Sequence, residues 1–155
     1  MVQPETPTPH RTVGALLRRS ACCLLLPLSA TAAEYQLQLF ETPQELAKRS
    51  DPSPTGQAYW AAFAAYGEAL KAAGILRGGA ALRAGDEARS VRVTAGRTTV
   101  AAPRLAHAPA RPGGYFVIDV DSLDTALAWA AKSPTAQTGG VVDVRPFYPV
   151  PGMAR

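Results

Sequence analysis

Cysteine is scarce in this chain of 155 residues, because the two that occur, Cys22 and Cys23, are adjacent and precede the predicted folded domain. Adjacent cysteines in a tail cannot cross-link a domain, so the sequence predicts no stabilising disulfide. Histidine is equally rare, since His10 and His107 are far apart in sequence and neither lies near a thiol. This spacing argues against a zinc site, and no pattern in the sequence indicates another metal or a cofactor.

Long apolar runs and concentrated charge are missing as well. The apolar run at residues 21–28 is interrupted by Pro27 and is too short to cross a bilayer core of about 30 Å, so no membrane span is predicted. The formal net charge is +4. Residues 1–33 contribute three arginines and one glutamate, and the other 13 basic and 11 acidic residues leave a surplus of only two. Such an even mixture predicts no nucleic-acid-binding surface.

The first 33 residues differ in composition from the rest of the chain. Arg18-Arg19 precede the apolar run, and small residues occupy positions 29–33. Positive charge, an apolar stretch and small residues, in this order, are typical of a secretory signal peptide. A tail created by an upstream start codon would have a similar composition. Both interpretations stay open, and the protein is expected to be exported only if the first one holds.

From residue 34 to residue 148, the periodicity of apolar residues predicts one domain, followed by a short tail at 149–155. Alternation at period two indicates strands, and repeats three and four residues apart indicate helices. Large apolar residues at Trp60, Phe63 and Leu70 mark the expected buried face of the first helix, which Gly74 ends. The predicted strands are 35–40, 90–94, 97–101, 115–120 and 141–146, and the predicted helices are 57–73 and 123–131. Residues 75–82 are expected to form a strand or an extended connection.

Short local signals connect these elements. Ala95-Gly96 forms the turn of the predicted hairpin, Asp121 and Ser122 can cap the second helix, and Ser133-Pro134 closes it. The three prolines within residues 102–112 predict a loop. The resulting order of strands and helices predicts an α+β fold, namely a ferredoxin-like βαββαβ sheet with two helices on one face.

Several segments resemble the YciI-related proteins of the DGPF type. The similar segments are YWAAF at 59–63, YGEAL at 66–70, AGIL at 73–76, GGYFVIDVD at 113–121, LDTALAWA at 123–130 and VRP at 144–146. The resemblance implies a bacterial, cytoplasmic protein whose ferredoxin-like domain forms a homodimer through its sheet, as a dimeric α+β barrel. It also implies relatives that are enzymes or accessory proteins, with genes often beside extracytoplasmic-function sigma factors.

The chain departs from this family at two positions that carry chemistry. Ala-Pro-Arg-Leu at residues 102–105 stands where the family usually has Asp-Gly-Pro-Phe, and no histidine lies between Glu34 and Leu105. If the family's acid/base chemistry needs that carboxylate or histidine, this chain cannot perform it in that way. The family aspartate could equally serve only to shape a turn. No catalytic residue is therefore assigned.

Strand alternation divides the polar and apolar residues between two sheet faces. The residues expected to face the helices are Leu37, Leu39, Phe116, Ile118 and Val120. The residues expected on the opposite face are Gln36, Gln38, Arg92, Tyr115, Asp119, Asp143 and Arg145. A half-polar face predicts a polar cavity against a second subunit, with Arg145 and Arg92 as contacts for an anionic small molecule. The competing interpretation is that Arg92, Asp119, Asp143 and Arg145 pair with one another and bind no ligand.

His107 is the one histidine of the predicted domain. It titrates near neutral pH and could carry a proton, or it could be an exposed residue of a proline-rich loop. Three functions follow from these observations. The first is a homodimer that binds a small molecule or a protein partner. The second is a small acid/base enzyme of the dimeric α+β barrel type, and the third is an accessory protein of a sigma factor.

Overall fold

The computed structural model describes Met1 and residues 33–83, 87–105 and 108–152. The segment interpreted as a tail or signal peptide therefore lies, apart from its two end residues, outside the described part of the chain, as does His107. Among the described helices, none is long and apolar enough to cross a membrane.

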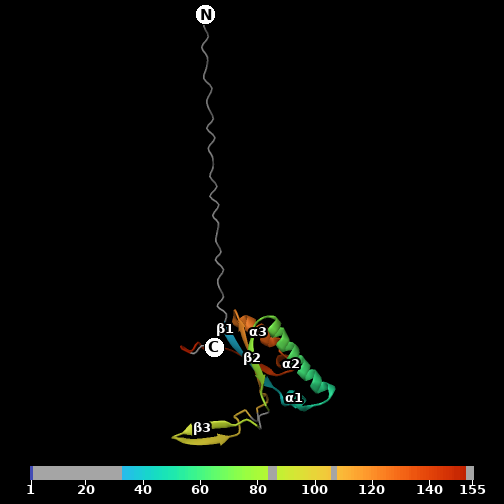
Figure 1. The fold of residues 1–155 in the computed structure, drawn as a ribbon, viewed down its shortest axis with the longest axis vertical. Coiled ribbons are helices and arrows are strands. Elements are labelled where there is room, and N and C mark those ends of the chain that lie inside the picture. Colours follow the sequence, from blue (N-terminus) through green and yellow to red (C-terminus); the bar gives the residue numbers. More distant parts are fainter. Residues whose placement is uncertain (2–32, 84–86, 106–107, 153–155) are drawn as a thin grey trace.

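A four-stranded antiparallel sheet forms the body of the protein (Figure 1). The strand order is β2-β5-β1-β6, with β1 at Ala33–Glu41, β2 at Leu76–Ala81, β5 at Arg111–Val120 and β6 at Val141–Pro146. Helices α2 (Pro54–Ala72) and α3 (Leu123–Ala131) pack against one face. This order of strands and helices confirms the predicted ferredoxin-like α+β fold.

The core lies between the sheet and the two helices. Along β1, Tyr35, Leu37, Leu39 and Glu41 are buried, and each residue between them is partly exposed, as period two requires. Opposite them, β5 contributes Ile118 and Val120, which are buried, while Phe116 is partly buried and packs against the core. The predicted assignment of Leu37, Leu39, Phe116, Ile118 and Val120 to the helix face is therefore confirmed.

Helix α2 differs from its prediction in its start and its buried face. It begins at Pro54 because Ser53 accepts a hydrogen bond from the backbone N–H of Thr55 and proline fits the first helical position. Its buried large residues are Tyr59, Tyr66 and Leu70, whereas Trp60 is 43% exposed. The expected stripe through Trp60 was wrong, because the two tyrosine hydroxyl groups find acceptors within the protein. At its end, Gly74 adopts φ 72°, as predicted.

Three short helical segments were not predicted. Helix α1 (Pro43–Ala47) and the 3-10 helix η1 (Lys48–Ser50) follow β1, and α4 (Pro134–Gln137) follows α3. Thr42 and Ser133 cap α1 and α4 through their hydroxyl groups, and a proline follows each of them. A cap residue followed by proline ends one element and begins the next, and at Ser133-Pro134 only the ending was predicted.

The hairpin of β3 (Ser90–Thr94) and β4 (Arg97–Ala101) has the predicted bounds and turn, with φ 47° at Ala95 and 76° at Gly96. It forms a separate two-stranded sheet that projects from the body (Figure 1). The placement of Arg92 on the second face of the main sheet was therefore wrong. Strand β5 also begins earlier than predicted, at Arg111, because Pro112 and Arg111 pair with the end of β1.

Candidate functional site

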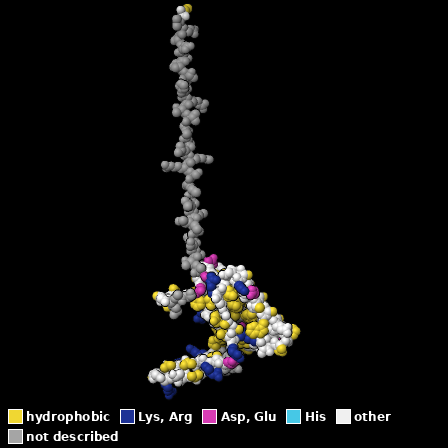
Figure 2. Space-filling model, in the orientation of Figure 1, with side chains coloured by type: hydrophobic (Ala, Val, Ile, Leu, Met, Phe, Trp, Pro, Cys, Tyr) yellow, Lys and Arg dark blue, Asp and Glu magenta, His cyan; other side chains and the backbone are white. Residues whose placement is uncertain are grey.

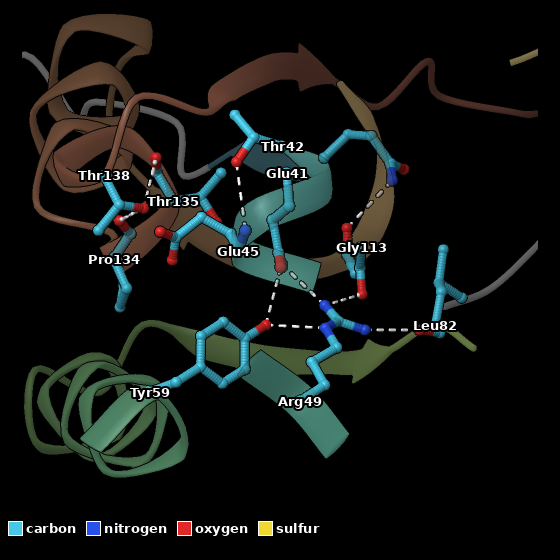
Figure 3. A network of polar contacts seen from close by, with 12 residues as sticks. Glu41, Thr42, Glu45, Arg49, Tyr59, Leu82, Gly113, Pro134, Thr135 and Thr138 are labelled. Atoms are coloured by element: carbon cyan, nitrogen blue, oxygen red, sulfur yellow. Dashed lines mark hydrogen bonds and ion pairs between the residues drawn. The ribbon is translucent and has the colours of Figure 1, made fainter. Parts of the chain in front are cut away.

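A buried carboxylate lies at the end of β1. Glu41 continues the inward-facing series of that strand, and 1% of its side chain is exposed. Its Oε1 accepts a hydrogen bond from Nη2 of Arg49 at 2.8 Å, and its Oε2 accepts one from the hydroxyl group of Tyr59 at 2.8 Å (Figure 3). This site was not predicted from the sequence. A carboxylate at the inward parity of a strand was the signal that could have found it, because a buried charge needs partners.

Arg49 connects Glu41 to three other parts of the fold. Its Nε donates to the hydroxyl oxygen of Tyr59 at 2.8 Å, and its Nη1 donates to the backbone oxygen of Leu82 at 2.7 Å. Its Nη2 also donates to the backbone oxygen of Gly113 at 2.7 Å. One guanidinium group thus joins η1 to β1, to α2, to the end of β2 and to the start of β5 (Figure 3). We call Glu41, Arg49 and Tyr59 the polar cluster.

The polar cluster fixes the protonation of Tyr59. Burial raises the pKa of the Tyr59 hydroxyl far above its ordinary value of 10.0, and the hydrogen bond to the Glu41 carboxylate raises it further. Tyr59 is therefore a neutral phenol throughout the physiological range. Its proton is committed to Glu41, and its oxygen accepts from Arg49. The arrangement is a rigid and internally satisfied network.

Gly113 makes room for the polar cluster. A Cβ atom at this position would overlap Oε1 of Glu41 and lie 2.8 Å from Nη2 of Arg49. Glycine is therefore required at position 113, because a larger residue would collide with the ion pair.

A cavity of about 230 Å³ adjoins the polar cluster. Helix α2 contributes one wall through the aromatic rings of Tyr59, Trp60 and Phe63, with 5.1 Å between the ring centres of Tyr59 and Trp60. Small residues of the strands form the opposite wall. The remaining lining residues are Leu39, Glu41, Arg49, Gly79, Ala80, Ala81, Gly113, Gly114 and Phe116. A mostly apolar cavity with a few convergent polar groups is the usual form of a small-molecule site.

The candidates predicted from strand alternation lie on the opposite sheet face. The register pairs Gln38 with both Tyr115 and Asp143, so these three residues are direct neighbours across β5, β1 and β6. Asp119 lies farther along β5, and Arg145 follows Asp143 on β6. Gln36 pairs with Arg145 in the same register, so the structure brings six of the seven candidates to one face. It does not bring Arg92 there, and His107 lies outside the described residues.

Some charges on this face pair with one another. Arg145 lies 3.2 Å from Asp143, and Arg77 lies 2.8 Å from Asp119. Gln38 donates to the backbone oxygen of Gly114 at 3.0 Å. The second carboxylate oxygen of Asp119 is buried and has no hydrogen-bond partner among the described residues. Ion pairing thus accounts for part of this polar face. The partner of Asp119 is Arg77, whereas the sequence had suggested Arg92 or Arg145.

Fold and site together define a ferredoxin-like α+β domain with a buried polar cluster and a cavity at one end of its sheet. Residues 39–150 match the model of the YCII-related domain family, and the chain belongs to that family. The resemblance stated from the sequence is thereby confirmed. A comparison with curated proteins finds no match.

Proposed function

We propose that this YCII-related protein is a homodimer that binds a small molecule in the cavity beside the polar cluster. The observation that carries the binding proposal is the aromatic wall of Tyr59, Trp60 and Phe63 facing small residues of β2 and β5. Aromatic side chains offer large contact areas at a low cost in conformational entropy. A cavity of about 230 Å³ accommodates a compact ligand with a single ring or a branched chain.

Binding is proposed in preference to catalysis because the groups of the polar cluster bond to one another. Both oxygens of Glu41 accept hydrogen bonds within the cluster, and the Tyr59 proton is directed at Glu41. Each carboxylate oxygen already accepts a hydrogen bond within the cluster, which favours a structural role for Glu41 over that of a general base. The cluster instead supplies a rigid base for the cavity, which favours recognition by a preformed shape.

The homodimer proposal is supported by apolar surface that the monomer leaves uncovered. None of the described helices packs against the second face of the sheet, where Val117 lies between Gln36 and Gly78. On the hairpin, Val91, Val93 and Val100 are 65%, 64% and 62% exposed. The register places these valines on one side of the hairpin, and Figure 2 shows hydrophobic side chains along it. An isolated two-stranded hairpin is marginally stable in water, so a second copy would stabilise it.

Nuclear magnetic resonance with benzyl alcohol as the probe tests the cavity. We expect saturable shifts of the amide signals of Gly79, Gly113 and Gly114, which lie around the cavity. Ala81→Leu adds side-chain volume to the cavity wall and should abolish these shifts. Ala101→Leu, an equal change at an exposed position of β4, should preserve them. Shifts that persist in Ala81→Leu would contradict binding at this site.

Light scattering tests the homodimer. Wild-type protein is expected to have twice the mass of the chain. Val117→Lys places a charge on the second sheet face and should yield a monomer. Leu123→Lys places the same charge on α3, at a residue that is 45% exposed, and should leave a dimer. A monomeric wild-type protein at micromolar concentration would overturn this part of the proposal.

A further inference from the structure

A second and larger cavity carries an excess of positive charge. Its volume is about 520 Å³, and it lies where residues that follow β2, the base of the hairpin, residues 103–105 and the start of β5 meet. Three arginines line it, namely Arg83, Arg104 and Arg111. Among the described residues that line it, Glu87 is the one carboxylate. We call this cavity the arginine cleft, and none of its described lining residues also lines the cavity beside the polar cluster.

Two of the three arginines lack a counter-ion within the described structure. Glu87 pairs with Arg83 at 2.7 Å, and it is therefore already engaged. Among the described residues, no carboxylate lies within 4.0 Å of Arg104 or Arg111. Glu41 is opposite Arg111 in the strand register, but its oxygens are occupied by Arg49 and Tyr59.

The Nε–H group of Arg111 gives a more specific indication. This atom is buried and has no hydrogen-bond partner among the described residues. A buried donor without an acceptor costs about 1–3 kcal/mol, so such groups in native proteins require an explanation. A guanidinium group binds a carboxylate or phosphate through two parallel hydrogen bonds, and an oxyanion in the cleft would supply the missing acceptor.

Apolar residues share the cleft with these charges. Leu82 and Leu105 line it and are 37% and 44% exposed. Pro103 and Pro112 add further apolar surface. Exposed leucines beside unpaired arginines match a ligand that combines an anionic head with a short hydrocarbon chain. A plain inorganic ion would leave this apolar surface in water.

We propose that the arginine cleft binds a small organic oxyanion, with its carboxylate or phosphate head at Arg104 and Arg111 and its apolar chain against Leu82 and Leu105. This site is additional to the cavity of the proposed function. Arg104 and Leu105 both belong to the Ala-Pro-Arg-Leu segment at residues 102–105, which gives the cleft a positive charge beside apolar side chains.

Isothermal titration calorimetry on the full chain tests the proposal with four probes: hexanoate, hexyl phosphate, 1-hexanol and inorganic phosphate. We expect hexanoate or hexyl phosphate to bind at least about tenfold more tightly than 1-hexanol. This factor corresponds to the loss of one charge-assisted hydrogen bond. The same anion should bind more tightly than inorganic phosphate. The preference between hexanoate and hexyl phosphate identifies the head group.

Three variants locate the binding. Arg111→Gln and Arg104→Gln should each weaken binding of the preferred anion about tenfold or more. Arg97→Gln removes an equal charge from the exposed strand β4 and should leave affinity unchanged. Arg104 is exposed, so its variant remains informative even if Arg111→Gln fails to fold. Absence of anion binding, equal binding of 1-hexanol, or equal losses in all three variants would overturn the proposal.

Discussion

The carboxylate of Glu41 and the guanidinium group of Arg49 lie 2.8 Å apart at the end of the sheet, and 1% of the glutamate side chain is exposed. Removing one partner of a buried ion pair leaves the other charge uncompensated, which costs about 3–5 kcal/mol. We therefore expect Arg49→Ala to lower the free energy of unfolding by roughly this amount. Chemical denaturation monitored by circular dichroism measures the change.

An exposed ion pair on α2 provides the control. Lys71 and Glu68 lie 3.8 Å apart, and 71% and 75% of their side chains are exposed. Exposed pairs contribute about 0–1 kcal/mol, so Lys71→Ala should have little effect. If the two variants lose similar stability, the polar cluster does not stabilise the packing of the elements that it joins.

The second prediction concerns the space beside the ion pair. Gly113→Ala would bring a Cβ atom against Glu41 and Arg49, and we expect a loss of about 1–3 kcal/mol from overpacking. Gly67→Ala is the control, because apart from the adjacent backbone of α2 no described atom lies within 4 Å of the added Cβ. There alanine should stabilise the helix by about 0.5–1 kcal/mol. Thermal unfolding would distinguish the two opposite signs, and a stable Gly113→Ala variant would contradict the steric account.

The polar cluster shows where prediction from the sequence ends. The hairpin and β6 were predicted at their observed bounds because alternation and a turn glycine are local properties. Glu41, Arg49 and Tyr59 lie on three different elements, and their contact depends on how those elements pack. Each looks ordinary in its own segment, and only the inward parity of Glu41 distinguishes it. Arg92 shows the same limit in another way. The bounds of its strand were predicted correctly, but the strand belongs to the separate hairpin sheet and not to the main sheet.

The third prediction concerns the cap of α3. Asp121 accepts hydrogen bonds from the hydroxyl groups of Ser122 and Thr125, at 3.1 and 2.7 Å. These bonds, that from Thr125 first, lower the pKa of the Asp121 carboxyl below 3.8. A lowered pKa in the folded state contributes stability above the unfolded value and loses it as pH falls through the folded value.

Asp121→Asn should therefore be less stable than wild type at pH 7, and the difference should shrink as pH falls below about 4. Asp124→Asn removes a carboxylate from the first turn of the same helix, outside this group of hydrogen bonds, and serves as the control. Urea denaturation between pH 2 and pH 7 measures both. A difference for Asp121→Asn that is constant over this range would show that its hydrogen bonds contribute nothing that depends on charge.

The fourth prediction concerns the alkaline limit of stability. Burial raises the pKa of Tyr66 well above its ordinary value of 10.0, and burial with the Glu41 hydrogen bond does the same for Tyr59. Above pH 10 the unfolded chain releases these two protons while the folded chain keeps them. Stability must then fall as pH rises, by up to about 1.4 kcal/mol per pH unit for each tyrosine.

Tyr66→Phe separates the two contributions. It removes the hydrogen bond from the Tyr66 hydroxyl group to the backbone oxygen of Trp129, 2.9 Å long, and should cost about 1 kcal/mol at pH 7. Between pH 10 and pH 11, however, the variant should lose less stability than wild type, because its unfolded chain releases one tyrosine proton fewer. Tyr148→Phe, at a residue that is 80% exposed, should follow the wild-type profile. Parallel alkaline slopes for wild type and Tyr66→Phe in guanidinium denaturation would refute a buried, neutral Tyr66 as a source of this pH dependence.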